Sequence, residues 1–225
     1  MRVWRAYLQA MTASYRFPPF ARMQPSLGVP PLSTLYGLLS AAVGRLVHPS
    51  ETVIGYVAPF KGRGQDLERI HAIGEGATYE GTDVIRRDFV VEPELWLYLD
   101  NLSLVEALRT PRYPLLVGRT TDLAELVRID PVDLKPVSEA EFRFTILPFP
   151  WEGVASPILA LPIAFDEVIP RRPLAVRPFH ILESKPQRVR YDERHGQIYQ
   201  DAEFGWGVYL HRWELVNSNA AASKI

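Results

Sequence analysis

The residue types that usually carry catalytic or metal chemistry occur in this sequence, but not in the patterns that such chemistry needs. The five histidines show no ligand-like spacing and form no His-Glu-x-x-His motif. The chain has no cysteine, which excludes disulfides and thiolate metal sites. Gly118-Arg119-Thr120-Thr121 lacks the lysine of a P-loop, and Gly205-Trp206-Gly207 lacks the third glycine of a dinucleotide fingerprint. We therefore predict no metal, no cofactor and no catalytic residue.

Metal-independent RNA cleavage is the one enzymatic activity that these residues leave open. It needs a base to deprotonate a ribose 2′-hydroxyl and an acid to protonate the leaving 5′-oxygen. The side chains of suitable type are Tyr36, His48, His180 and Lys185. Nothing in the sequence brings any two of them together, so cleavage is the alternative and binding the first expectation.

The distribution of charge points to contact with a polyanion. The net charge is only −1, but residues 1–50 contain five arginines and no acid. Residues 51–170 carry 11 Lys and Arg against 20 Asp and Glu, whereas residues 171–195 carry seven against three. Of the 25 basic residues, 21 are arginine, whose planar fork binds phosphate and stacks on bases. This asymmetry favours RNA as a partner. The alternatives are that the arginine content reflects the base composition of the genome, or that the arginines face an acidic protein.

A proline-rich loop from Ser14 to Pro31 leads into a predicted helix. Its polar side chains include no acid and are those of Ser14, Arg16, Arg22, Gln24 and Ser26. Because a helix N-terminus is positive and presents free N–H groups, the two arginines beside it predict a phosphate-binding site. An ordinary solvated loop is the equally open alternative.

The helix is predicted to begin at Ser33, which would cap it, followed by Thr34. Its apolar face consists of Leu35, Leu38, Leu39, Ala42, Val43 and Leu46. The other face is a stripe of small residues, namely Gly37, Ser40, Ala41 and Gly44. Glycine inside a helix costs about 0.8–1 kcal/mol relative to alanine. We therefore expect another backbone to approach this stripe closely, either in tight helix-on-sheet packing or as a bound strand of RNA.

The first half of the chain reads as an α+β unit of ferredoxin-like order, β-α-β-β-α-β, which RRM domains share. The predicted elements around the helix are strands at 2–12, 52–58, 86–99 and 115–117 and a helix at 103–109. A further helix is predicted from Gly118 to Val127. Between the second and third strands, Lys61 to Val84 shows no hydrophobic periodicity and contains five glycines, which is typical of a functional insert.

The remainder of the chain reads as strands and turns. Candidate strands lie at 142–147, 158–165, 174–182, 188–191, 197–200 and 208–216, with a hairpin turn at 193–196. We predict a domain over residues 1–128, a β-rich region over 129–216 and a flexible tail over 217–225. No apolar run reaches the roughly 18–20 residues that span a bilayer, and no signal-peptide core is recognisable, so a cytoplasmic protein with no membrane partner is expected.

Three segments carry a family resemblance. They are Ala13-Ser14-Tyr15-Arg16 followed by Val29-Pro30-Pro31-Leu32-Ser33-Thr34-Leu35-Tyr36-Gly37, then Arg86-Arg87-Asp88-Phe89, then Tyr113-Pro114-Leu115-Leu116-Val117-Gly118-Arg119. Over about the first 125 residues the chain resembles the CRISPR-associated RAMP proteins, and most of all the family of CRISPR-associated protein five. In that family the insert at 61–84 is a projecting hairpin called the thumb.

The resemblance implies a non-catalytic subunit of a type I Cascade complex that binds the 5′ handle of the crRNA in antiviral defence. Its partners would be the crRNA, the backbone RAMP subunits and the large subunit, with target DNA contacted only indirectly. One branch of the family instead processes repeat RNA without metal, which keeps the endoribonuclease alternative open. A scaffold that binds only protein is the third hypothesis. The expected RNA-binding residues are Ser14, Arg16, Arg22, Gln24, Ser33, Thr34, Lys61, Arg63, Arg69, Arg86, Arg87 and Arg119.

Overall fold

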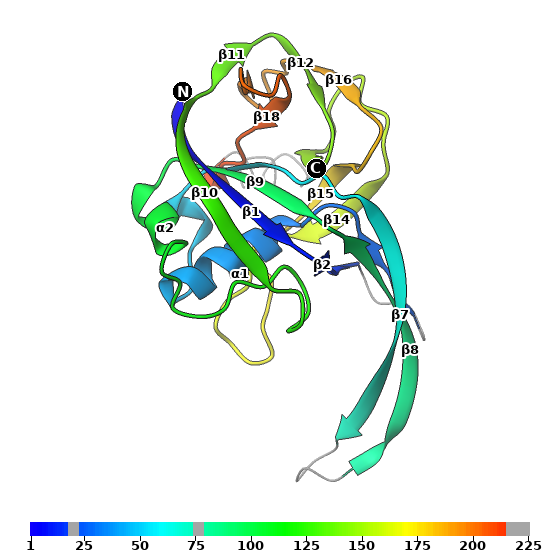
Figure 1. The fold of residues 1–225 in the computed structure, drawn as a ribbon. Helices are drawn as coiled ribbons and strands as arrows, with labels where there is room; N and C mark the ends of the chain where they lie inside the picture. Colours follow the sequence, from blue (N-terminus) through cyan, green and yellow to red (C-terminus); the bar gives the residue numbers. More distant parts are fainter. Residues whose placement is uncertain (18–22, 74–78, 215–225) are drawn as a thin grey trace.

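The computed structural model describes residues 1–17, 23–73 and 79–214, which form a β-rich fold with few helices (Figure 1). The first part contains β1 (Arg2–Ala10), β2 (Thr12–Ala13), β3 (Tyr15–Arg16), β4 (Met23–Gln24), β5 (Ser26–Leu27), α1 (Leu32–Val43), the 3₁₀ helix η1 (Pro49–Glu51), β6 (Ile54–Val57), β7 (Gly62–Ile73), β8 (Tyr79–Val91), β9 (Glu94–Leu99), α2 (Leu102–Ala107) and β10 (Ala124–Asp133). The second part contains β11 (Lys135–Val137), β12 (Glu139–Phe142), β13 (Thr145–Pro148), β14 (Ile158–Pro162), β15 (Val176–Leu182), β16 (Gln187–Arg190), β17 (Ile198–Gln200) and β18 (Gly207–Tyr209).

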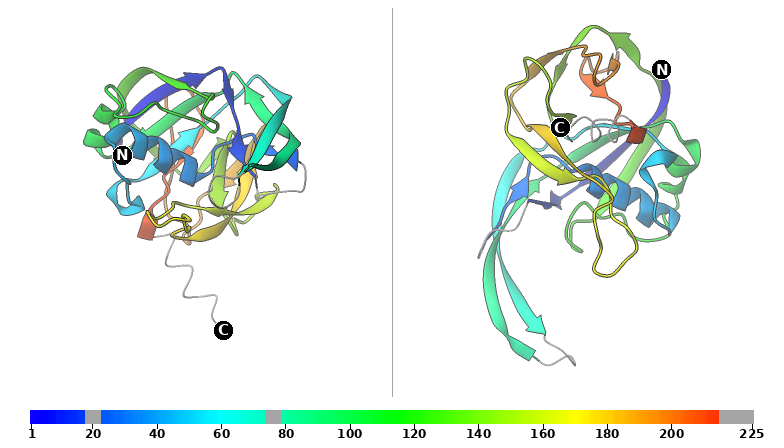
Figure 2. Two further views of the ribbon diagram at one scale, coloured as in Figure 1. Left: turned by 90° about the horizontal axis from the view of Figure 1, so that it is seen from below. Right: turned by 180° about the vertical axis from the view of Figure 1, so that it is seen from behind.

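A four-stranded antiparallel sheet in the order β10-β1-β9-β6 forms the centre of the molecule. α1 lies between β1 and β6 in the chain, and α2 lies between β9 and β10. Both helices pack on one face of the sheet, where Ala6 and Leu8 of β1 meet Leu35 and Leu39 of α1 in the main core (Figures 1 and 2). The alternate side chains of β1 point to the opposite face, which we call the outer face of the sheet.

The helix α1 begins one residue earlier than predicted and without a side-chain cap. Its N-cap is Pro31, in extended conformation, so the expected capping role of Ser33 is wrong. The two prolines stop the helix from starting sooner, and burial of Leu35, Leu38 and Leu39 on the core stabilises it instead.

Another backbone approaches the stripe of small residues at the C-terminal end of α1, as expected, because the Tyr113 and Arg112 backbone N–H groups donate to the Ala41 and Ala42 oxygens at 3.0 and 2.8 Å. The start of the stripe has no such neighbour. A Cβ added at Gly37 would meet nothing within 4 Å, so this position faces open space. Gly44 ends the helix rather than lying within it, with a left-handed φ of 78° that favours glycine. Leu46 therefore lies beyond the helix and not on its apolar face.

The predicted elements between α2 and β10 differ from the observed ones. Asn101 accepts a hydrogen bond from the Ser103 backbone N–H and caps α2. The segment 115–117 forms only an isolated bridge, between Leu116 and Leu123, instead of a strand. Gly118 to Val127 is a turn followed by the start of β10, not a helix, because its backbone pairs with β1 along the sheet edge.

The second part of the chain consists of strands and turns, as expected, although their boundaries differ. The strand predicted at 142–147 is broken by Phe144, which has a positive φ of 55°. The predicted turn at 193–196 is closed by a bridge between Asp192 and Gly196. Buried side chains of this part, including Ile146, Phe179 and Ile181, join the same core as α1. Within the described ranges, no helix is long and apolar enough to cross a membrane.

Arg5 connects the central sheet to the C-terminal part of the chain. Its guanidinium is 2% exposed and contacts Asp201 at 2.8 Å, Asp130 at 3.3 Å and Glu203. The Tyr98 hydroxyl donates a further hydrogen bond to Asp201. Two of the five arginines in residues 1–50 are thus opposed by acids from elsewhere: Arg5 by this cluster, and Arg45 by Glu51. The absence of acids from residues 1–50 therefore overstates how positive that surface is.

His211 fixes the C-terminal strand region against β6. Its backbone N–H and C=O exchange hydrogen bonds with Ile54, and its ring lies edge-on to Tyr209 and Phe179. Burial lowers the pKa of His211 to about 3, because the charged imidazolium would be removed from water.

We expect this buried imidazole to make the fold acid-sensitive. Between pH 6.5 and about 4 the unfolded chain binds a proton at His211 that the folded chain excludes, so stability falls as the pH is lowered. The slope is up to about 1.4 kcal/mol per pH unit. His211→Phe should reduce the loss of unfolding free energy between about pH 7 and about pH 4.5, measured by urea denaturation. An equal loss in the variant and the parent would contradict the assignment.

Candidate nucleic-acid interface on the β7–β8 hairpin

β7 and β8 form a long antiparallel hairpin that curves away from the body of the protein (Figure 1). Pairing runs from Gly62 opposite Val91 to Ile73 opposite Tyr79. The segment is thus a regular hairpin, although its sequence shows no hydrophobic periodicity. Along each strand it is the charge of the side chains, and not their hydrophobicity, that alternates with a period of two residues, because both faces of the hairpin are largely solvated.

One face of the hairpin, which we call the arginine face, carries mainly basic, neutral and apolar side chains. It consists of Arg63, Gln65, Leu67, Arg69, His71, Thr82, Val84, Arg86 and Asp88. Arg69 and Arg86 are exposed and have no ion-pair partner among the described residues. Leu67 lies opposite Arg86, and Val84 lies opposite Arg69, so two arginines and two exposed apolar side chains form one patch. Asp88, the acid on this face, accepts a hydrogen bond from Gln65.

The other face, which we call the acidic face, is directed partly toward the body. It carries Asp66, Glu68, Ile70, Asp83, Ile85, Arg87 and Phe89. Glu68 pairs with Arg87 on the neighbouring strand and with Arg119 of the body at 3.3 Å. The Arg119 guanidinium also lies over the Phe89 ring, 5.2 Å from its centroid. These contacts hold the hairpin at its root and turn its arginine face outward.

The residues behind Arg119 are closely packed. Asp122 is fully buried and pairs with Arg119 at 3.1 Å, while the Thr12 hydroxyl donates to its carboxylate at 2.6 Å. Gly118 has a φ of 147°, and a Cβ there would lie 2.5 Å from the Ser14 backbone oxygen. A glycine is therefore required at this position for the turn to reach Ser14.

The predicted RNA-binding residues divide into those engaged within the chain and those that are free. Ser14 is buried and donates to the Asp88 backbone oxygen, and Gln24 is buried and donates to the Phe17 oxygen. Lys61 pairs with Glu92, and Arg63 pairs with Glu183. Ser33 and Thr34 are half-buried at the start of α1. Arg22 lies outside the described residues.

The predicted phosphate-binding site at the start of α1 already has a carboxylate beside it. Glu183 accepts a hydrogen bond from the Gly28 backbone N–H and pairs with Arg63. Arg16 lies in β3, paired with β5, and is exposed with no ion pair within the described ranges. Met23 is 40% exposed and lies beside Arg86, because β4 runs parallel to β8 at that point.

The four acid–base candidates have defined positions on separate elements. Tyr36 is buried in α1 and donates to the Pro49 oxygen, and burial raises its pKa. His48 accepts from the Ser50 backbone N–H as the cap of η1. His180 in β15 accepts from the Trp151 backbone N–H at Nε2, so its Nδ1 carries the proton and faces Ser156. Lys185 is exposed at the edge of a groove of about 390 Å³.

Comparison with known proteins relates this fold to CRISPR proteins. No sequence profile of a known family matches the chain, and no curated protein is similar enough to count as a relative. A chain of a CRISPR RNA-guided surveillance complex superposes with a TM-score of 0.58 at 15% identity, over 84% of this chain and 91% of that chain. A chain of the type III-B Cmr-beta complex bound to cognate target RNA and AMPPnP gives 0.52 at 12% identity, over 84% and 86%. A CRISPR protein from Archaeoglobus fulgidus gives 0.51 at 12% identity, over 94% and 100%.

These three similarities define the class of fold. The chain shares its fold with these CRISPR proteins, as the sequence resemblance predicted. At 12–15% identity the likeness concerns the fold, and residue roles have to be argued from this chain's own side chains.

We expect Arg119 to stabilise the hairpin root rather than to bind a ligand. Arg119→Met would leave the buried Asp122 carboxylate without its guanidinium, at a cost of about 3–5 kcal/mol. Arg86→Met removes an exposed arginine with no ion pair in the described structure and should change the unfolding free energy by less than about 0.5 kcal/mol. Urea denaturation measures both. Adding Asp122→Asn to Arg119→Met should recover part of the loss, and equal stabilities of the two arginine variants would contradict this role.

Proposed function

We propose that this protein is a non-catalytic RNA-binding subunit of a type I CRISPR effector complex that holds the 5′ handle of the crRNA. The observation that carries the proposal is the patch on the arginine face, where Arg69 and Arg86 stand free beside exposed Leu67 and Val84. Arginine forks bind phosphates, and apolar side chains pack on unstacked bases. A chain of similar fold belongs to a CRISPR RNA-guided surveillance complex, which supports RNA as the partner.

The order of the elements along the chain supports the proposed ferredoxin-like fold, the thumb insert and the domain organisation. The order β10-β1-β9-β6, with one helix in each half, supports a ferredoxin-like unit over residues 1–128. The hairpin leaves this unit between β6 and β9, where the thumb of the resembled family is inserted. The β-rich region 129–216 completes the proposed organisation, and a cytoplasmic location fits such a complex. The tail expected at 217–225 lies outside the described residues.

Within the proposed interface, the free arginines contribute most to RNA affinity. Arg16, Arg69 and Arg86 contact phosphates, and Leu67 and Val84 lie against bases. Ser14, Gln24, Ser33, Thr34, Lys61, Arg63, Arg87 and Arg119 act mainly by shaping and holding the root of the hairpin. Ile70 lies on the acidic face and is therefore less suited to packing against a base.

The salt dependence of RNA binding tests this interface. For single strands, each phosphate neutralised contributes about −0.7 to the slope of log K against log salt. Arg69→Gln with Arg86→Gln should therefore flatten the slope by about 1.4, measured with the repeat RNA of the same CRISPR locus. The control, Arg188→Gln with Arg190→Gln, removes the same charge from arginines that pair with Glu139. An unchanged slope in the first variant, or equal changes in both, would refute the interface.

An endoribonuclease that processes repeat RNA is the alternative function. The four candidate side chains give it little support, since Tyr36 is buried and His180 presents a protonated Nδ1 to Ser156. We expect repeat RNA to remain intact during incubation with the purified chain, with or without EDTA. A discrete product ending in a cyclic phosphate, lost in His180→Ala or Lys185→Ala, would establish the alternative instead.

A further inference from the structure

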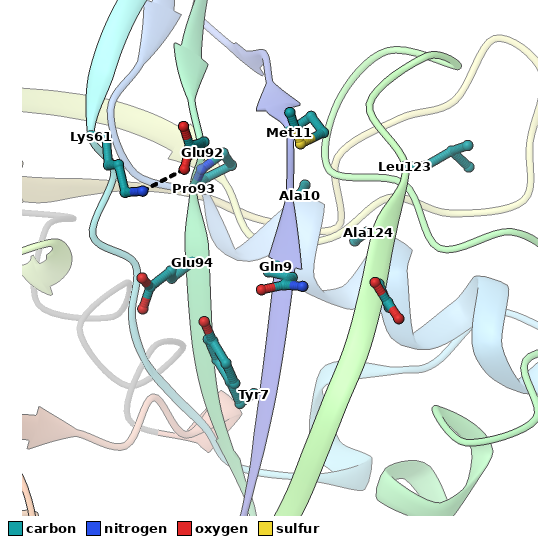
Figure 3. A pocket seen from close by; sticks show the side chains of 11 residues that line it. Tyr7, Gln9, Ala10, Met11, Lys61, Glu92, Pro93, Glu94, Leu123 and Ala124 are labelled. Atoms are coloured by element: carbon teal, nitrogen blue, oxygen red, sulfur yellow. Dashed lines mark hydrogen bonds and ion pairs between the residues drawn. The ribbon is translucent and has the colours of Figure 1, made fainter.

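The outer face of the central sheet is divided into a covered half and an open half. Phe204 and Trp206 of the C-terminal region lie over the Trp96 ring and cover one half. The other half is a groove of about 430 Å³ near the root of the hairpin, shown in Figure 3. It is lined by Tyr7, Gln9, Ala10, Met11, Lys61, Glu92, Pro93, Glu94, Leu123, Ala124 and Glu125.

Two carboxylates flank an amide across the floor of this groove. Gln9 in β1 is directly opposite Glu94 in β9 and Glu125 in β10, so the three side chains point to the same face. Neither Glu94 nor Glu125 forms a salt bridge in the described part of the chain. Lys61, the base that lines the groove, is engaged by Glu92. The groove therefore has two carboxylates without an ion-pair partner in the described ranges, and one of them, Glu94, accepts a hydrogen bond from the Trp96 indole N–H at 3.3 Å.

The remaining walls suit a side chain that is both flat and partly apolar. Tyr7 forms one wall, with its ring stacked on Trp96 at 4.1 Å between centroids. Met11 and Leu123 stand at the rim, 77% and 59% exposed. Aromatic, thioether and aliphatic surfaces of this kind pack against the methylene chain of a long basic side chain.

The same sheet face already binds two arginines of this chain in such surroundings. The guanidinium groups of Arg5 and Arg128 lie 5.4 and 5.3 Å from the Trp96 ring centroid. Both are paired with Asp130 and Glu203. The groove repeats this combination of an aromatic ring and two carboxylates, but its lining cation, Lys61, is paired with Glu92 and not with Glu94 or Glu125.

We propose that the groove binds an arginine side chain on a segment of a partner protein. The guanidinium lies between Glu94 and Glu125 and against Tyr7, while its methylene groups contact Met11 and Leu123. The planar fork of arginine fits two carboxylates and an aromatic face better than a lysine ammonium does. RNA is excluded, because the two carboxylates would repel its phosphates. This surface is separate from the arginine face and does not depend on RNA binding.

A titration with a small probe tests the groove directly. N-acetyl-arginine amide is added to the ¹⁵N-labelled full chain, and the Gln9 side-chain amide and the Trp96 indole signals are followed by NMR. N-acetyl-citrulline amide, which is neutral and nearly the same shape, and N-acetyl-lysine amide are the comparison probes. We expect saturable shifts with the arginine probe, weaker ones with lysine and none with citrulline.

Variants decide whether the carboxylates are responsible. Glu94→Gln with Glu125→Gln should weaken the arginine probe at least about tenfold, as expected for the loss of charge-assisted hydrogen bonds. Glu106→Gln with Glu152→Gln removes the same charge outside the groove and should leave the shifts unchanged. Equal binding of citrulline, equal weakening in both variants, or no saturable shift would overturn the proposal. The test contains no RNA, so it fails or succeeds independently of the proposed function.

Discussion

The buried charge of Arg5 is the constraint on which the arrangement of the whole chain depends. A guanidinium that is 2% exposed must be paired, because an unpaired charge in the interior costs several kcal/mol. Two of its acids, Asp201 and Glu203, come from the C-terminal region, which must therefore fold back over the sheet. That segment places Phe204 and Trp206 on the outer face, where RRM domains bind RNA on their aromatic side chains. In this chain the equivalent surface is occupied at one end and acidic at the other.

Because the sheet face is partly covered and partly acidic, the arginine face of the hairpin is the surface that we propose for a polyanion. A two-stranded arm is marginally stable alone, so its orientation has to come from contacts with the body. Arg119 supplies these contacts, because it pairs with Glu68 of the hairpin and with Asp122 of the body. It thereby holds the acidic face of the hairpin against the body. The same interaction that anchors the arm also turns Arg69 and Arg86 toward solvent. Arg119 is thus a positioning residue whose energetic role is inside the chain.

Hydrophobic periodicity was sufficient to predict elements of the core such as β1 and α1. It was insufficient where the structure depends on contacts between residues far apart in the sequence. The alternation in β1 and the apolar face of α1 follow from burial on one side, and both were predicted. The start of β10 was predicted as a helix instead, because its pairing with β1 is not local. Hydrophobic periodicity alone did not reveal the hairpin, which only the family resemblance implied, because that test fails when both faces are exposed to solvent. Charge alternates there instead, from Arg63 and Gln65 to Asp66 and Glu68, and this signal was present in the sequence. The pairing of Arg5 with Asp201 spans 196 positions and has no local signature.

The net charge of −1 conceals two surfaces of opposite sign. The groove and the arginine face meet at the root of the hairpin, because Lys61 and Glu92 of the groove adjoin Gly62 and Val91, where the pairing of β7 with β8 begins. Surfaces of opposite sign select different partners, since each repels what the other attracts. RNA on the arginine face and an arginine in the groove would therefore occupy neighbouring sites without competing. A chain of near-zero net charge would be able to bind both partners, because its positive and negative charges lie on different surfaces. The net charge of the sequence does not show this separation.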